Sequence, residues 1–71
     1  MNECTFEVIK ELAALSGADE SIQKKLCLIS WNGKPPVFDI RAWNSKNRPY
    51  KGITLTNDEA KALKEALEMA L

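Results

Sequence analysis

The chain has 71 residues, with ten basic and ten acidic side chains, no histidine and a formal net charge of zero. A chain of this length forms one small domain whose core supplies a thin margin of stability. Its two cysteines are too few for a disulfide framework and, without histidine, for a zinc site. No apolar run approaches the roughly 20 residues that span a membrane, and no secretory leader is visible. We therefore expect a cytoplasmic protein with free thiols and no metal or other cofactor, stabilised as a homodimer.

Charge is unevenly distributed along the chain. Residues 21–55 carry seven basic side chains and one acidic side chain, a net charge of +6, and the remainder of the chain carries −6. A basic middle between acidic ends indicates an anionic partner, which the neutral total alone would argue against. Surface charge that segregates without a function is the alternative.

Residues 5–15 are compatible with two kinds of element. Phe6, Val8 and Leu12 fit one face of a strand, but the apolar residues of this segment also recur at helical spacing. Because glutamate, lysine, leucine and alanine are good helix formers, the local pattern slightly favours a helix. Residues 16–19 then end the element.

Residues 22–31 predict a strand that is apolar on both sides at its centre. Asn32 and Gly33 follow it, and this pair accepts positive φ and is typical of a hairpin turn. Pro35 and Pro36 cannot donate backbone hydrogen bonds, so pairing with the next strand should begin late.

Residues 37–44 alternate strictly, which predicts a strand with two different faces. One face is apolar at three of its four positions, and the other places Arg41 beside Trp43. A basic loop then leads into a second short strand at 50–55. A hairpin that carries arginine, tryptophan and lysine together predicts a surface for a flat, negatively charged ligand.

Residues 57–71 predict a helix. Thr56 and Glu59 have the spacing of a capping box that would start it. One face of this helix carries an apolar stripe that consists of Leu63, Ala66, Leu67, Ala70 and Leu71. The stripe can cover the sheet, and in so short a chain it can also form a twofold dimer contact.

The sequence offers little for catalysis. It has no histidine, the commonest general base, and its three glycines are isolated, so it contains no phosphate-binding loop. Asp39 lies two residues before Arg41 and is more simply part of a structural ion pair or of a hairpin hydrogen bond than a catalytic group. We therefore expect neither an enzyme nor a small-molecule substrate.

Trp31 and Trp43 both fall at strand ends near cations. The bases of single strands stack on such aromatic faces while a positive groove follows the backbone. Duplex reading would instead use a basic helix, whereas the predicted helix is near neutral or acidic. The pattern favours a single-stranded ligand, with burial in a core as the alternative for each tryptophan.

Three segments carry a family resemblance: SWNGKPP at 30–36, DIRAW at 39–43 and KGITL at 51–55. Followed by the acidic start of a helix, they resemble the positive-cofactor-four (Sub-one) family of transcriptional coactivators, and within it the small bacterial, YdbC-like branch. The resemblance is good from residue 22 to the end of the chain and weak before it.

The resemblance implies an α+β fold, in which a curved four-stranded antiparallel sheet is followed by one C-terminal helix and the chain assembles as a homodimer. Residues 1–71 would form a single domain that binds single-stranded DNA, with the sheet over 5–55 and the helix over 57–71. The resemblance also implies a long strand at 5–15, against the local pattern.

Carried over by position, Arg41 and Lys51 would be cations that contact the DNA backbone, and Trp31 and Trp43 would occupy aromatic positions. The spacing between Arg41 and Trp43 is one residue shorter than in the eukaryotic pattern, which leaves the direction of Trp43 open. The regulatory tail rich in serine and lysine is missing, so the resemblance does not extend to coactivator activity as such.

The sequence thus predicts a coactivator-like, single-stranded DNA-binding protein with little sequence specificity, acting in transcription or DNA maintenance. RNA binding and a protein-interaction module built on the C-terminal helix are the alternatives. The predicted nucleic-acid-binding residues are Lys25, Trp31, Lys34, Arg41, Trp43, Lys46, Arg48 and Lys51. The predicted dimer or core contacts of the helix are Leu63, Leu67 and Leu71.

Overall fold

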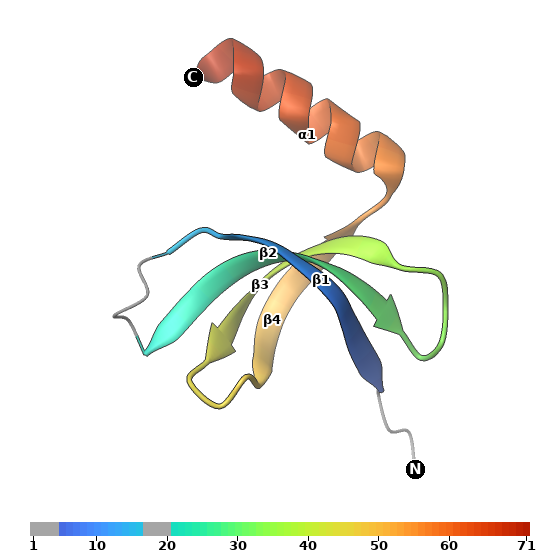
Figure 1. Cartoon of the computed structure of the whole chain (residues 1–71). Coiled ribbons are helices and arrows are strands. Elements are labelled where there is room, and N and C mark those ends of the chain that lie inside the picture. Colours follow the sequence, from blue (N-terminus) through green and yellow to red (C-terminus); the bar gives the residue numbers. More distant parts are fainter. Residues whose placement is uncertain (1–4, 17–20) are drawn as a thin grey trace.

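The computed structural model describes residues 5–16 and 21–71, and these form an α+β fold of four strands followed by one helix (Figure 1). Each strand pairs antiparallel with the next, so the sheet order follows the chain. The predicted order of elements is confirmed. The elements are β1 (Phe6–Ala14), β2 (Ile22–Trp31), β3 (Val37–Asn44), β4 (Pro49–Leu55) and α1 (Asn57–Ala70).

The first element is a strand, so the helix that the local pattern favoured at 5–15 is wrong and the strand that the resemblance implied is confirmed. β1 pairs with β2 from Phe6 to Ala14, with register shifts after Val8 and after Glu11. Each bulge inserts one residue and moves the alternation to the other face. The apolar residues therefore lose the period of two and imitate helical spacing. Pairing with β2 overrides the weak helix propensity.

The turn between β2 and β3 has the predicted chemistry. Asn32 and Gly33 both have positive φ, 52° and 76°. The Lys34 amide donates to the Trp31 carbonyl at 2.9 Å, which closes the turn. Pairing between β2 and β3 begins only at Val37, beyond the two prolines, as predicted.

The helix begins where the sequence predicts. Thr56 is the N-cap, its hydroxyl accepts from the Glu59 amide at 3.1 Å, and the Glu59 carboxylate accepts from the Thr56 amide at 2.8 Å. Figure 1 shows α1 standing over the convex side of an arched sheet. No residue of α1 is buried, so the helix covers the sheet only loosely. It is too short and too polar to cross a membrane, and no other helix occurs in the described ranges.

The buried core lies on the opposite, concave side of the sheet. Asp39 and Trp43 of β3 are buried there, with Cys27 and Ile29 of β2. The alternate positions of the same strands face α1, and we call them the helix-facing surface. Its members are Leu26, Phe38, Ile40 and Leu55.

Candidate nucleic-acid interface

Three aromatic rings gather on the concave face. Trp31 is the last residue of β2, whereas Trp43 pairs with Gln23 near the start of that strand. Even so, the Phe6 ring lies 5.5 Å from the Trp31 ring and 5.8 Å from the Trp43 ring, measured between centroids. The arch of the sheet brings the two ends of the face within reach of one side chain (Figure 1). We call Phe6, Trp31 and Trp43 the aromatic cluster.

The three rings differ in exposure. Trp43 points into the concave face and is 5% exposed, so the direction that the sequence left open is resolved toward the core. Phe6 is 39% exposed, and Trp31 is partly exposed. Among the described residues, neither indole N–H has a hydrogen-bond acceptor. Trp43 is therefore the buried base of the cluster, and Phe6 and Trp31 are the rings that a ligand can reach; we call these two rings the accessible part.

An ion pair lies beside the cluster. Arg41 donates from Nε to Oδ1 of Asp39 at 2.6 Å and from Nη2 to Oδ2 at 2.8 Å. Asp39 is 0% exposed, which confirms the structural ion pair that its position in the sequence suggested. Nη1 of Arg41 donates to the Tyr50 carbonyl at 3.1 Å, and its Cζ lies 4.7 Å from the centre of the Trp31 ring. The guanidinium thus connects β3, β4 and the end of β2.

Gly52 makes room for this arginine. It pairs with Arg41 across β3 and β4, and a Cβ at this position would collide with the Arg41 Cβ and the Ile40 carbonyl. Only glycine lets β4 approach so closely without a shift of the backbone. The glycine of the KGITL segment therefore has a steric role in the concave face.

Lys25 is also held by a carboxylate. Its Nζ lies 3.0 Å from Oε1 of Glu11 on β1. Both residues line a pocket of about 320 Å³ on the concave face, together with Phe6, Cys27 and Trp43. Burial, and next the charge of Glu11, raises the pKa of the Cys27 thiol, which favours its protonated form. Cys4 lies outside the described residues.

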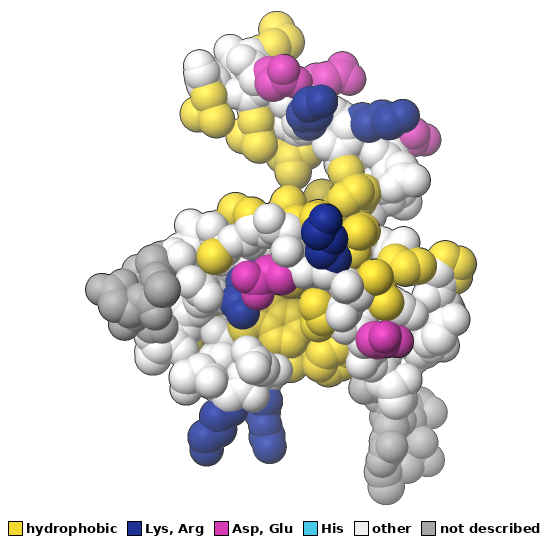
Figure 2. All heavy atoms as spheres, viewed as in Figure 1, with side chains coloured by type: hydrophobic (Ala, Val, Ile, Leu, Met, Phe, Trp, Pro, Cys, Tyr) yellow, Lys and Arg dark blue, Asp and Glu magenta, His cyan; other side chains and the backbone are white. Residues whose placement is uncertain are grey.

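The other predicted cations are exposed. Lys34 lies in the β2–β3 loop, Lys46 and Arg48 lie in the β3–β4 loop, and Lys51 lies on β4. Among the described residues, none of the four has a carboxylate within ion-pair distance. Figure 2 shows basic side chains extending below the sheet, on the side away from α1. Gly52 pairs with Arg41 on the concave face, and neighbouring residues of a strand point to opposite faces. The Lys51 side chain therefore points to the helix side of the sheet. The structure therefore brings Lys25, Arg41 and the tryptophans together and leaves the loop cations at the rim.

Phe6 and Tyr50 also belong to this face, and the sequence did not single them out as site residues. Phe6 lies in the segment whose element type was ambiguous, so its face could not be assigned. Tyr50 is an exposed aromatic residue on β4, and its carbonyl accepts from Arg41. The strand that the resemblance implied at 5–15 places Phe6 on one face of the sheet, but the curvature that carries it to both tryptophans has no signal in the alternation.

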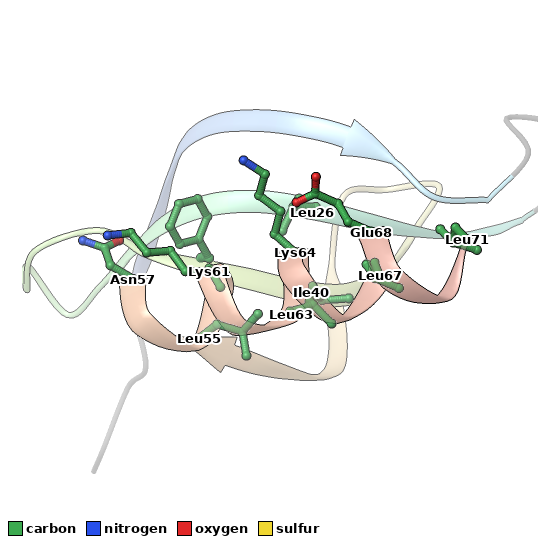
Figure 3. Close-up of a pocket in the computed structure, with 12 residues that line it drawn as sticks. Leu26, Ile40, Leu55, Asn57, Lys61, Leu63, Lys64, Leu67, Glu68 and Leu71 are labelled. Atoms are coloured by element: carbon green, nitrogen blue, oxygen red, sulfur yellow. The ribbon is translucent and has the colours of Figure 1, made fainter.

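An open apolar groove of about 760 Å³ separates α1 from the helix-facing surface. Leu63 and Leu67 line it from α1, and Leu26 and Ile40 line it from the sheet (Figure 3). Leu67 is 46% exposed although it points at the groove. Leu71 also lines the groove, so all three predicted helix contacts meet there.

Comparison with known proteins identifies a family and a relative to which the chain is similar. Residues 18–66 match the family model of Transcriptional Coactivator p15 (PC4), a range that contains the DIRAW and KGITL segments. An uncharacterized protein of Treponema pallidum (strain Nichols) is 41% identical over 63 residues, which cover 87% of this chain and 74% of that protein.

Proposed function

The chain belongs to the transcriptional coactivator p15 (PC4) family, and on that premise we propose that it binds single-stranded DNA on the concave face of its sheet, with little sequence specificity. The proposed role is that of a binding protein in transcription or DNA maintenance, without a catalytic step. Residues 1–71 are proposed to act as one binding domain.

The accessible part of the aromatic cluster is the observation that carries this proposal. Phe6 and Trp31 present ring surface on a concave face, and Trp43 supports them from below. Stacking on an aromatic side chain contributes about 1–3 kcal/mol per base and tolerates any base, because every base has a π-face. A face of this kind favours single strands, whose bases are free to stack.

The exposed cations supply the phosphate contacts in this proposal. Lys34 lies beyond one end of β3, and Lys46 and Arg48 lie beyond the other, so a strand crossing the concave face would meet positive charge at both ends. Lys51 on β4 points to the other side of the sheet and is therefore not part of this path. Lys25 and Arg41 lie on the face itself, where each already has a carboxylate partner.

The proposed assembly is a homodimer in which α1 of a second copy fills the groove between α1 and the sheet. Two features support this occupant. No residue of α1 is buried within one chain, although Leu63, Leu67 and Leu71 form an apolar stripe along the groove. A chain this short also gains the core that it lacks by pairing with a copy of itself. Twofold symmetry would give each groove the same occupant.

Titration of a fluorescent oligo-dT at several salt concentrations tests the proposed function. The logarithm of the binding constant should fall with the logarithm of salt, by a slope of about −0.7 for each phosphate neutralised. Lys46→Ala should make that slope shallower by about 0.7 units, since its side chain is exposed at the rim. Lys10→Ala is the matched control, because Lys10 on β1 pairs with Leu28, which pairs with Phe38 on the side of the sheet away from the concave face.

The result of this titration also distinguishes the proposal from its two alternatives, a protein-interaction module and an RNA-binding protein. Wild-type protein that does not bind oligo-dT, with a protein partner recovered through α1, would contradict the proposal in favour of an interaction module. An RNA strand of the same sequence that outcompetes the DNA would move the ligand class to RNA.

Trp31→Ala should weaken binding by about 1–3 kcal/mol and leave the slope unchanged.

A further inference from the structure

We propose that Arg41 is a positioning residue that fixes the Trp31 ring for stacking, and that it does not contact phosphate. This inference rests on the proposed function and assigns one of its residues a different role from the one that the resemblance implies. Three features of the concave face carry it: the partner of the Arg41 charge, the arrangement of the guanidinium, and the space that Gly52 leaves for it.

The charge of Arg41 is already balanced. Both carboxylate oxygens of Asp39 accept from the guanidinium, at 2.6 and 2.8 Å, and Asp39 is fully buried. The Arg41 side chain itself is only 14% exposed. A phosphate that took the guanidinium would leave a buried carboxylate without a partner, which is strongly unfavourable. Arg41 is therefore a poor source of the net positive charge that phosphate binding needs.

The remaining contacts of Arg41 point to Trp31. Nη1 donates to the Tyr50 carbonyl, which holds the guanidinium plane in place, and Cζ lies 4.7 Å from the centre of the Trp31 ring. Trp31 ends β2 and is followed at once by the turn, so β3 does not pair beside it. The guanidinium and the tilted Phe6 ring restrict the indole from two sides. A ring that is held in place before binding loses less freedom when a base stacks on it.

Gly52 shows how closely this arrangement is fitted. A side chain at this position would collide with the Arg41 Cβ, so the path of Arg41 along the face requires glycine in the neighbouring strand. The buried carboxylate, the carbonyl acceptor and the missing Cβ all serve the position of one guanidinium. Together they favour a fixed support beneath the ring over a cation free to reach a ligand.

Arg41→Lys is the first test, because it keeps the charge but loses the planar fork and the stacking surface. We expect affinity for oligo-dT to fall about three- to tenfold with an unchanged salt slope. Lys10→Arg is the matched control and should bind as wild type does, because Lys10 pairs with Leu28, which pairs with Phe38 of the helix-facing surface, away from the concave face. Equal affinities for Arg41→Lys and wild type would overturn the proposal.

The charge itself is tested with a neutral pair. Arg41→Gln combined with Asp39→Asn removes both charges, so no buried carboxylate is left alone. Its salt slope should equal that of wild type, whereas Arg48→Gln should make the slope shallower by about 0.7 units. A change of slope in the double variant as large as that in Arg48→Gln would show that Arg41 neutralises a phosphate.

A spectroscopic measurement on wild-type protein keeps the proposal testable if these variants fold poorly, and a second one on Arg41→Lys tests the positioning role without DNA. In wild-type protein, the Arg41 Nε–H resonance should keep its shift when oligo-dT is added, because its bond to Asp39 persists; movement on titration would contradict this. Protein labelled with 5-fluorotryptophan gives two ¹⁹F signals. Arg41→Lys should shift or broaden the Trp31 signal and leave the Trp43 signal in place, and an unchanged Trp31 signal would refute the positioning role. This readout needs no DNA, so its result is independent of whether the wild type binds oligo-dT.

Discussion

The two faces of the sheet are built from alternate residues of the same strands, yet they differ in how far one chain completes them. On the concave face, Cys27, Ile29, Asp39 and Trp43 are buried by the chain itself, and the buried charge has its partner. On the helix-facing surface, α1 leaves an open groove and none of its own residues is buried. A change on the concave face should therefore act at any protein concentration, and a change in the groove should act through association.

The largest expected effect comes from breaking the buried ion pair on the concave face. Asp39→Ala leaves Arg41 without its partner, and removing one member of a buried pair costs about 3–5 kcal/mol. For so small a domain this is most of the free energy of unfolding. Urea unfolding followed by circular dichroism measures it. Asp58→Ala, an exposed residue in the first turn of α1, should cost under about 1 kcal/mol. A similar loss for both variants would contradict the difference between the faces.

The next effect should appear only on the groove side. Leu67→Glu places a charge in the proposed dimer contact, and losing one buried leucine there costs about 2–3 kcal/mol in each copy. The dimer should then dissociate at least about 100-fold more readily, as measured by analytical ultracentrifugation. Met69→Glu is the control on the same helix, because Met69 is 91% exposed and does not line the groove. Equal dissociation of the two variants would rule out this groove as the contact.

A smaller loss is expected at the glycine beneath Arg41. Gly52→Ala forces β4 away from β3, and overpacking of this kind costs about 1–3 kcal/mol. Thermal unfolding at two protein concentrations should show the same loss at both, since the concave face belongs to one chain. Gly33→Asn is the control: Gly33 has open space around it and a positive φ that asparagine tolerates. If the Gly52→Ala and Gly33→Asn proteins were equally stable, β4 could move away from β3 without a loss of stability, which would contradict this prediction.

The smallest effect concerns the buried thiol. The pKa of Cys27 lies above the ordinary thiol value of 9.0, first because of burial and then because of Glu11. The folded chain thus keeps a proton that the unfolded chain loses, so this contribution to stability is complete below pH 9.0 and declines as the pH rises above it. With Cys4→Ser in both proteins, the stability of wild type relative to Cys27→Ala should fall above that pH in urea titrations. Parallel pH profiles would show that the thiol is not desolvated.

Local chemistry predicted much of this fold because some residues determine their own surroundings. Thr56 and Glu59 form the capping box at the helix start, and Asn32 and Gly33 adopt the positive φ of a turn. Alternation in 37–44 assigned Phe38 and Ile40 to one face and Asp39 to the other. In each case the deciding interaction lies within a few residues of chain.

The rest depended on partners distant in sequence. The two bulges in β1 give its apolar residues a helical spacing, so the strand was not recognised from the local pattern. The bulges are a feature of the pairing between β1 and β2. Curvature carries Phe6 to both Trp31 and Trp43, although nothing in the spacing of these residues records it. The ion pair of Asp39 with its neighbour Arg41 was predicted. The position of the Arg41 guanidinium over Trp31 was not, because it depends on the curvature that brings the strand ends together. The predicted contacts with DNA and between copies stay predictions.

The bulges of β1 also limit how copies of the chain can associate. β1 and β4 are the outer strands of the sheet, and a regular outer strand offers a row of free N–H and C=O groups to which further strands can add without end. In β1 the two bulges interrupt that row, and β4 begins with Pro49, which has no N–H to offer. In the proposed homodimer, α1 would bring two copies together, while the outer strands of the sheet are poorly suited to further strand addition.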